Sequence, residues 1–342
     1  MTTKAWVFRT NPNTYDLRLE ARDSIPPTAI PPDSVLVRIR AVSLNYRDVI
    51  AWRNLAGRMM DGRVPASDGA GVVIACGQKV TQWQVGDRVA GCFFQTWQSG
   101  RFEMRHHKND LGGTLDGMLQ EEICLPASGL VKIPNHLDFE QAATLPCAAL
   151  TAWYALTYRG GLESGQSVLC LGTGGVSIFA LQLAVALGAE VLITSSDDLK
   201  LHKAKELGAA KTINYRTYPQ WADEVTRLTN GAGVDHVVEV GGPGTLEQSM
   251  KSIAAGGHLA LIGVLTGFGS PATSLFPLLA KNVQLNGIYV GPRDQFLAMN
   301  EFLERKNLYP IIDRVFELRD APAAFEYLES GQHFGKVVVR CD

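Results

Sequence analysis

The chain has 342 residues, of which 46% are hydrophobic and 19% are charged. Because a domain usually holds about 100 to 200 residues, this length predicts two domains. The net charge is −2, from 32 basic and 34 acidic side chains, and no run of like charge is present. This balance argues against a nucleic acid or an anionic membrane as partner and favours a small neutral molecule.

The six cysteines include no Cys-x-x-Cys pair, so we expect free thiols in a reducing compartment rather than disulfides or a zinc ribbon. The N-terminus is polar where a signal peptide would need an apolar core. The most apolar stretch, residues 176–193, is interrupted by polar residues, whereas a membrane span needs about 18 unbroken apolar residues. A cytoplasmic protein without membrane contact is the expectation.

The first 130 residues predict a β-rich domain of hairpins, because alternating or Gly-punctuated runs such as 35–42 and 69–75 recur there. Near the C-terminus, helical patterns at 295–306 and 321–330 precede a strand at 336–340. This tail is too short to fold alone. We therefore expect it to complete the first domain, which would be discontinuous.

Between these parts, short β-rich runs alternate with helical patterns, as in a parallel sheet covered by helices. Six strands are predicted, the number in a complete dinucleotide fold. They are Val168–Leu171, Glu190–Thr194, Lys211–Asn214, His236–Val240, His258–Ile262 and Val283–Ile288. The predicted fold is α/β, with a six-stranded Rossmann domain at 135–291 and a β-rich domain at 1–134 and 292–342.

A glycine-rich turn follows the first of these strands and opens a helical pattern, which is the context of a dinucleotide-binding fingerprint. Its expected cofactor contacts are Gly172, Thr173, Gly174, Gly175 and Val176. Gly172 would allow the tight turn and Gly174 the close approach of a pyrophosphate. The third glycine of the fingerprint is replaced by Ser177. A glycine-rich turn without a ligand is the disfavoured alternative.

The end of the second strand carries hydroxyls where an NAD-specific site needs a carboxylate for the ribose. Hydroxyls and cations suit a 2′-phosphate, so NADPH (NADP) is predicted over NADH. Asp197 and Asp198 keep the NADH alternative open, because a small shift in register would bring a carboxylate within reach. The residues expected at the phosphate are Ser195, Ser196, Lys200, Tyr215 and Arg216. The alternative for Lys200 and Arg216 is that they are ordinary solvated charges.

Over its whole length the sequence resembles the medium-chain dehydrogenase/reductase superfamily, which includes zinc alcohol dehydrogenases and zinc-free quinone oxidoreductases. Within it, the turn segment 172–182 and the segment 239–245 are most similar to the branch named zinc-type alcohol dehydrogenase-like. The resemblance implies a GroES-like catalytic domain beside the Rossmann domain. The segments that carry it are 44–48, 65–71, 85–89, 143–153, 172–182, 237–242 and 334–338.

Zinc-dependent members hold the catalytic metal with a Cys, a His-Glu pair and a second Cys. Matching their motifs places Asn45 at the first Cys, Asp68-Gly69 at the His-Glu pair and Cys147 at the second Cys. One Cys with an Asp is a poor zinc set, so no metal and no zinc are expected. The loop that would hold a structural zinc contains only Cys92, and the polar His106-His107 segment is expected to be a solvated loop.

The resemblance also implies where cofactor and substrate bind. Asn45 would contact them, Tyr46 would donate a hydrogen bond to the substrate oxygen, and Asp48 would orient the turn. Solvent as the proton source remains an open alternative to Tyr46, and Cys147 is read as a buried thiol rather than a redox group. Further cofactor contacts are expected at Thr151, Gly241, Gly263, Val264, Gly287, Phe334 and Lys336. A substrate pocket is expected at Trp52, Phe94 and Trp97, with a place in the hydrophobic core as the open alternative for these side chains.

The predicted activity is hydride transfer from NADPH to a quinone, enone or activated carbonyl without a metal, on a small apolar or aromatic substrate. An NAD(P)-dependent alcohol dehydrogenase or carbonyl reductase is the alternative within enzymes. The alternative of another class is an NADPH-binding regulatory or structural protein with little turnover. Because the strand at 283–289 ends the sheet, a homodimer through this edge is expected.

Overall fold

The computed structural model describes residues 3–10, 17–24, 29–57 and 60–341, and it divides into two compact units. Unit 1 comprises residues 1–148 and 291–342, and unit 2 comprises residues 149–290. The expected β-rich domain, at 1–134 and 292–342, falls within unit 1. None of the helices described is long and apolar enough to span a bilayer.

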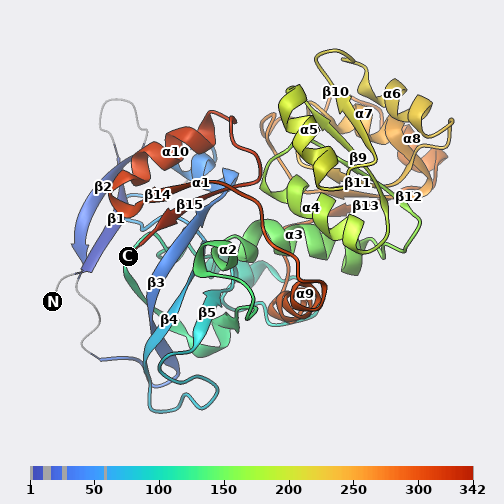
Figure 1. Ribbon diagram of the computed structural model, residues 1–342. Coiled ribbons are helices and arrows are strands. Elements are labelled where there is room, and N and C mark those ends of the chain that lie inside the picture. Colours follow the sequence, from blue (N-terminus) through green and yellow to red (C-terminus); the bar gives the residue numbers. More distant parts are fainter. Residues whose placement is uncertain (1–2, 11–16, 25–28, 58–59, 342) are drawn as a thin grey trace. The chain divides into compact units, whose positions relative to one another are not determined.

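Unit 2 is built on a parallel sheet of six strands in the order β10-β9-β8-β11-β12-β13, with helices in the connections between them (Figure 1). This order is that of a complete dinucleotide-binding fold, which confirms the predicted fold class. Its strands are β8 Ser167–Cys170, β9 Glu190–Ser195, β10 Lys211–Asn214, β11 Val234–Glu239, β12 Ile253–Leu261 and β13 Gln284–Gly287.

The helices of unit 2 begin and end as the local sequence predicts. Asp197 caps α5 by accepting hydrogen bonds from the amides of Leu199 and Lys200. Gly188 and Gly208 follow the ends of α4 and α5 with positive φ. The helices are α3 Leu150–Trp153, α4 Gly175–Ala186, α5 Asp198–Glu206, α6 Trp221–Leu228, α7 Leu246–Ser252 and α8 Phe276–Ala280, with a π-helical turn at Tyr154–Arg159.

Unit 1 is β-rich. Its main sheet has the order β14-β15-β3-β4-β5-β7, with β6 also paired to β3, and a separate hairpin joins β1 to β2. The strands are β1 Thr3–Thr10, β2 Leu17–Ser24, β3 Ser34–Leu44, β4 Asp68–Cys76, β5 Arg88–Gly91, β6 Glu122–Pro126, β7 Leu130–Lys132, β14 Ile312–Glu317 and β15 Lys336–Arg340.

The helices of unit 1 are short except for α9. They are α1 Tyr46–Trp52, α2 Phe139–Ala143, α9 Arg293–Lys306 and α10 Ala321–Glu329, with 3-10 turns at Met104–Lys108, Ala127–Gly129 and Leu318–Asp320. A π-helical turn, Leu145–Ala149, runs to the boundary with unit 2.

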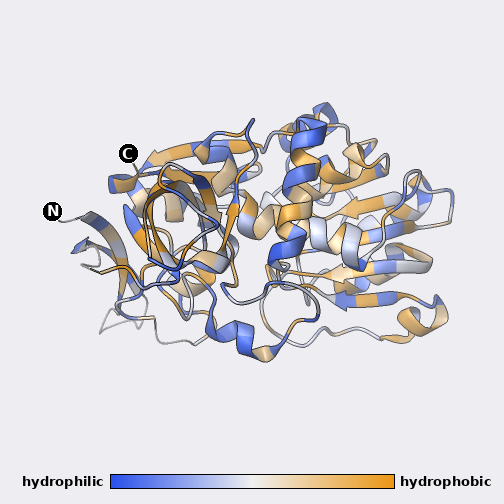
Figure 2. Ribbon diagram, turned by 90° about the horizontal axis from the view of Figure 1, so that it is seen from below, coloured by the Kyte–Doolittle hydropathy of each residue, from blue (hydrophilic) through white to orange (hydrophobic). Residues whose placement is uncertain are grey.

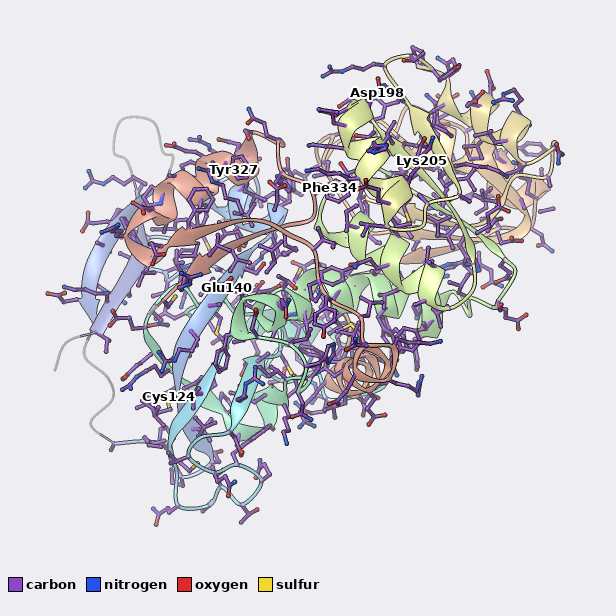
Figure 3. All side chains as sticks on the ribbon, in the orientation of Figure 1. Cys124, Glu140, Asp198, Lys205, Tyr327 and Phe334 are labelled. Carbon is purple, nitrogen blue, oxygen red and sulfur yellow. The ribbon has the colours of Figure 1, made fainter. Side chains whose placement is uncertain are left out.

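The C-terminal tail, residues 291–342, belongs to unit 1. β15 pairs antiparallel with β3 and parallel with β14, so it lies between two strands of the same sheet. Arg340 at the end of β15 donates a hydrogen bond of 2.8 Å to Glu140 on α2, which is labelled in Figure 3. The tail thereby brings Lys336, the first residue of β15, next to the end of β3.

Each unit has its own apolar core. In Figure 2 the hydrophobic residues follow the strands, and hydrophilic residues mark many of the turns and outer helical positions. The core of unit 1 includes Phe8, Trp52 and Phe325, whose rings meet edge to face. The core of unit 2 contains buried side chains of its strands, among them Leu169 and Leu192. Burial of apolar side chains therefore stabilises both units, and the loops and strand ends remain available for binding and catalysis.

Candidate active site

The turn between β3 and α1 carries Asn45, Tyr46 and Asp48. The Asp48 carboxylate accepts a hydrogen bond of 2.8 Å from the Asn45 amide, and the Asn45 carbonyl accepts one of 2.8 Å from the amide of Asp48. This reciprocal pair closes the first turn of α1. Asn45 and Asp48 are both buried, so the turn is held rigidly inside unit 1.

Arg47 provides the countercharge for the buried Asp48. Its guanidinium lies 3.4 Å from the Asp48 carboxylate and 3.0 Å from that of Asp110, and it donates to the Leu111 carbonyl at 2.8 Å. Burial raises the pKa of Asp48 to about 6, and the positive charge of Arg47 opposes that rise. The local sequence contains no sign of the pairing with Asp110, because 63 residues separate it from Arg47.

The buried residues Asn45, Asp68 and Lys336 form a polar cluster with the half-buried Cys147, here called the Asn45 cluster. The Lys336 ammonium donates to the side-chain oxygen of Asn45 at 2.5 Å and to the Leu44 carbonyl at 2.7 Å. The Asp68 carboxylate accepts hydrogen bonds from the Ser67 hydroxyl at 2.6 Å and from the Cys147 backbone amide at 3.0 Å. Residues distant in sequence thus meet at the end of β3.

Burial dominates the electrostatics of the Asn45 cluster. It raises the pKa of Asp68, while Lys336 and hydrogen bonds from Ser67 and Asn45 act in the opposite direction. It also lowers the pKa of Lys336, against the attraction of Asp68, and raises that of the Cys147 thiol. Cys147 is therefore a protonated thiol at neutral pH, whereas a reactive cysteine needs a lowered pKa.

Tyr46 is half-buried at the start of α1. Among the residues that the structure describes, its hydroxyl has no hydrogen-bond partner, and its ring packs against the core of unit 1. A phenol in this state can donate a hydrogen bond to a ligand oxygen.

The three aromatic residues predicted to line a substrate pocket lie in the core of unit 1. Trp52 contacts Phe325 edge to face, and Phe94 contacts Trp97 in the same way. The exposed fractions of Trp52, Phe94 and Trp97 are 8%, 1% and 2%. Their contacts with other side chains account for their burial, which is the alternative that sequence left open.

The expected solvated loop at His106-His107 is wrong for His106. That residue lies in a 3-10 turn, is buried, and its ring stacks on Trp97. Its Nδ1 is 2.9 Å from the Thr96 hydroxyl. Sequence reasoning missed this because the aromatic partners, not the polar neighbours in the chain, set the environment of the ring.

In unit 2 the predicted fingerprint turn lies at the carboxyl end of β8. Gly172 has a φ of +72°, a conformation that strongly favours glycine, and no atom lies within 4 Å of a Cβ built on Gly174. The turn leads into α4, whose first amides lack intrahelical partners. Ser177 replaces the third glycine without strain, because its buried hydroxyl donates to the Leu171 carbonyl at 2.6 Å.

The end of β9 presents hydroxyls rather than a free carboxylate. The Thr194 hydroxyl accepts a hydrogen bond from the Gly172 amide at 3.1 Å, and Ser195 is buried at the last position of the strand. The two following acidic residues already have partners: Asp197 caps α5, and Asp198 (Figure 3) accepts a hydrogen bond of 2.7 Å from Asn214.

The remaining predicted cofactor residues are distributed over both units. Lys200 is in the first turn of α5, whereas Tyr215 and Arg216 are exposed after β10. In unit 2, Thr151 is buried on α3, Gly241 follows β11, Gly263 and Val264 follow β12, and Gly287 ends β13. Phe334 and Lys336 belong to unit 1, where both are buried.

Glu239, at the carboxyl end of β11, is a buried carboxylate that sequence reasoning did not single out. It accepts hydrogen bonds from the amides of Gly241 and Gly242 at 2.7 and 2.9 Å, and from the hydroxyls of Thr245 and Ser249. These four donors hold the loop that contains Gly241. An acidic residue directly after the buried apolar pair Val237-Val238 was the signal that could have found it.

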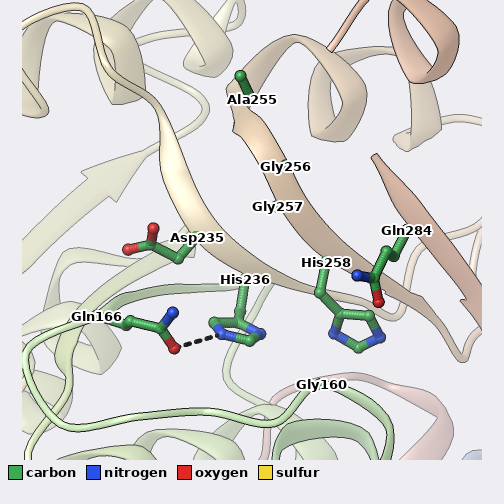
Figure 4. Close-up of a pocket in the computed structure, with 9 residues that line it drawn as sticks. All are labelled: Gly160, Gln166, Asp235, His236, Ala255, Gly256, Gly257, His258 and Gln284. Carbon is green, nitrogen blue, oxygen red and sulfur yellow. Dashed lines mark hydrogen bonds between the residues drawn. The ribbon is translucent and has the colours of Figure 1, made fainter. Parts of the chain in front are cut away.

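A small polar pocket of about 110 Å³ lies at the other end of the same sheet (Figure 4). It is lined by residues at the amino ends of the strands, and the His236 ring hydrogen-bonds Gln166 at 2.9 Å. Burial lowers the pKa of His258 to about 4, so its imidazole is neutral at physiological pH. Ligands of doubly wound sheets bind at the carboxyl ends of the strands, so this pocket is not the expected nucleotide site.

Comparisons with known proteins agree with this architecture. Residues 31–135 match the family described as alcohol dehydrogenase GroES-like domain, and residues 175–305 match the family described as zinc-binding dehydrogenase. A zinc-type alcohol dehydrogenase-like protein of Schizosaccharomyces pombe is 43% identical over 92% of this chain and 93% of its own length. The chain belongs to the medium-chain dehydrogenase/reductase superfamily. It is therefore an oxidoreductase of a superfamily that binds NAD(P).

Two solved structures of this superfamily illustrate its range. A provisionally named alcohol dehydrogenase of Sinorhizobium meliloti 1021 has 39% identity and a TM-score of 0.91, with 99% of each chain covered. A quinone oxidoreductase of Pseudomonas syringae has 28% identity and a TM-score of 0.81, covering 99% of this chain and 100% of its own. The superfamily fold thus serves more than one substrate class.

The Asn45 cluster does not fit the zinc that the family description implies. Of the three positions matched to metal ligands, Asn45 supplies an amide, Asp68 a carboxylate and Cys147 the single thiol. The fourth member, Lys336, brings a positive charge. Catalytic zinc is held by three deprotonated or imidazole ligands, and no group of three His, Cys, Asp or Glu able to hold a metal occurs within the described residues.

Proposed function

We propose that this enzyme is an NADPH-dependent reductase that transfers hydride to a quinone, an enone or an activated carbonyl without a catalytic metal. The observation that carries this proposal is the Asn45 cluster. In it the Asn45 amide occupies a position matched to a zinc ligand, and the Lys336 ammonium is hydrogen-bonded to that amide. Oxidation of an unactivated alcohol demands an electrophile for its oxygen, whereas quinones and enones accept hydride more readily. The groups of the Asn45 cluster therefore favour reduction of activated substrates over oxidation of unactivated alcohols.

NADPH, when bound, supplies the hydride, and unit 2 has the groups to hold it. The amides at the start of α4 and the open space at Gly174 suit a pyrophosphate. The Glu239 hydrogen bonds order the loop at Gly241, which also lies at the carboxyl edge of the sheet. These residues bind and orient the nucleotide; none of them carries out proton transfer.

The preference for NADPH rests on the end of β9. A carboxylate there would bond the ribose hydroxyls of NADH and repel a 2′-phosphate. Asp197 and Asp198 are instead used by α5 and Asn214. The hydroxyls of Ser195 and Ser196, with the cations of Lys200 and Arg216, form a set that suits a phosphate.

In unit 1, Tyr46 and Asn45 are the groups proposed to meet the substrate. The Tyr46 hydroxyl can donate to an oxygen on which charge develops. Asn45 is held in place by Lys336 through its side chain and by Asp48 through its backbone. Such preorganisation lowers the cost of orienting donors during the reaction.

The test of this proposal is NADPH oxidation, followed at about 340 nm, against quinones, enones, aldehydes and ketones, with metal analysis of the same sample. We expect turnover of quinones or enones that a chelator leaves unchanged. Stoichiometric zinc, or activity abolished by the chelator, would overturn the metal-free mechanism. If no acceptor oxidises NADPH, the reductase proposal fails.

The cofactor preference has its own test. Lys200→Ala should raise the KM for NADPH about 10-fold or more and leave that for NADH unchanged, because one charge-assisted contact is lost. Lys205→Ala, in the last turn of the same helix (Figure 3), is the matched control. A preference for NADH that Lys200→Ala does not alter would refute the phosphate assignment.

The second candidate is an alcohol dehydrogenase or carbonyl reductase, which the names of the Schizosaccharomyces and Sinorhizobium proteins favour. The same substrate panel separates the two. Turnover of simple aldehydes and ketones, or oxidation of simple alcohols with NADP, faster than enone reduction would select this candidate.

We also propose a homodimer through the edge of the unit 2 sheet. β13 is the edge strand, and Leu285 within it is 40% exposed. An unpaired edge with an apolar side chain can pair with a second copy. Light scattering should show a dimer for the wild type and a monomer for Leu285→Lys. A monomeric wild type would refute this proposal.

A further inference from the structure

Lys336 is a buried cation placed by the sheet itself. It is the first residue of β15, and the next residue, Val337, pairs with Leu44 at the end of β3. Its ammonium is held by the Leu44 carbonyl and the Asn45 side-chain oxygen, at 2.7 and 2.5 Å. Lys336 is 3% exposed, so this lysine is not a mobile surface charge.

The neighbours of Lys336 are groups that would otherwise attract a metal ion. Asp68, Cys147 and Asp48 each interact with its charge. Asp68 and Cys147 occupy positions matched to zinc ligands, and so does Asn45, whose oxygen is already occupied by the ammonium. A lone buried carboxylate is costly without a positive partner, and here Lys336 provides that charge.

We propose that Lys336 is the resident cation of this site, which excludes a divalent metal and fixes the orientation of the Asn45 amide. This inference rests on the metal-free part of the proposed function. With its oxygen held by Lys336, Asn45 directs its NH2 group away from the lysine and towards the Ser43 carbonyl, to which it donates at 3.5 Å. Lys336 is thus a positioning residue for Asn45 rather than a group that touches substrate.

The positive charge of Lys336 explains why the site would exclude a divalent metal. A divalent cation placed among Asn45, Asp68 and Cys147 would stand within a few ångströms of the ammonium, in a buried region where like charges repel strongly. The amide of Asn45 cannot replace the missing thiolate, because an amide nitrogen is not a zinc ligand and its oxygen is engaged. Removing the charge and restoring the thiolate should therefore convert the site into one that binds zinc.

The experiment compares Asn45→Cys with the double variant Asn45→Cys/Lys336→Met. Both offer two thiols and the Asp68 carboxylate, the three-ligand arrangement of a catalytic zinc site, and they differ only in the ammonium. Zn²⁺ affinity is measured by competition with a chromophoric chelator, and Co²⁺ binding by its thiolate absorption. We expect one equivalent of Zn²⁺ in the double variant, bound at least about 100-fold more tightly than in Asn45→Cys.

Equal affinities in the two variants would overturn the proposal, and so would failure of both to bind zinc, because the lysine would then not be what excludes the metal. If the double variant does not fold, Asn45→Cys/Lys336→Gln repeats the comparison with an uncharged side chain that still donates to Leu44. None of these measurements depends on turnover. A wild type inactive towards enones would remove the proposed reductase function and leave the inference about Lys336 standing.

Discussion

Asp48 offers a direct test of the electrostatics of the site, through the substitution Asp48→Asn. Burial raises the pKa of Asp48 in the folded chain from its ordinary value of 3.8 to about 6. Between these values the folded chain keeps a proton that the unfolded chain has lost. Stability therefore falls as the pH rises through this window, by about 1.4 kcal/mol per pH unit.

The two pKa values differ by about 2 units, so the ionised Asp48 destabilises unit 1 by about 3 kcal/mol above pH 6. This penalty is absent below about pH 4. An asparagine has a similar shape, keeps an oxygen that can accept from the Asn45 amide, and cannot ionise. The variant should consequently gain about 3 kcal/mol relative to wild type between pH 4 and pH 6.5.

The assay is urea unfolding at intervals across this pH range, followed by tryptophan fluorescence. Trp6, Trp52, Trp83 and Trp97 lie in unit 1, so four of the six tryptophans report on the unit that contains Asp48. Glu301→Gln, an exposed carboxylate on α9, is the matched control and should show no such gain. A difference between Asp48→Asn and wild type that stays constant from pH 4 to pH 6.5 would refute the reasoning.

Four further substitutions test the turn, the glycines after β12 and at the end of β13, and the proton source. Ser177→Ala removes a buried hydrogen bond and should destabilise unit 2 by about 1 to 2 kcal/mol in urea unfolding; no loss would mean that the hydroxyl is dispensable. A Cβ on Gly263 would lie 1.8 Å from the Val240 carbonyl oxygen, whereas one on Gly287 would meet nothing within 4 Å. Gly263→Ala should therefore lower the melting temperature and Gly287→Ala should not, and equal effects would contradict the clash. Tyr46→Phe should lower kcat about 100-fold at unchanged NADPH KM if the phenol donates the proton; full activity would assign the proton to solvent.

Most of the fold could be predicted because its signals are local. β9 and β10 begin at the predicted residues, Glu190 and Lys211, and the fingerprint turn follows β8 as its glycines indicate. β12 is longer than predicted, beginning at Ile253 instead of His258, because the exposed Ala255 and Gly256 interrupt the apolar pattern between these two residues. The tail is too short for an independent core, which is why the sequence predicts that it joins another part of the chain.

The site was predicted less completely than the fold. Asn45, Tyr46 and Asp48 share one short motif, so sequence could group them. The partners of that motif are far away in the chain: Arg47 meets Asp110, and Asn45 meets Lys336 across 291 residues. No spacing rule links such pairs, because strand pairing and not sequence distance brings them together.

By itself the sequence determined the two-part architecture, the nucleotide turn and the superfamily, because periodicity, glycine placement and short motifs are local properties of the chain. The tertiary structure decided what the residues at the zinc-ligand positions do. Pairing of β15 with β3 carries the Lys336 ammonium to Asn45 and into the electrostatic field of Asp68. The effect of Lys336 on these residues depends on burial and charge together. Water would screen the charge of a lysine on the surface, whereas the same charge in a buried position interacts strongly with its neighbours.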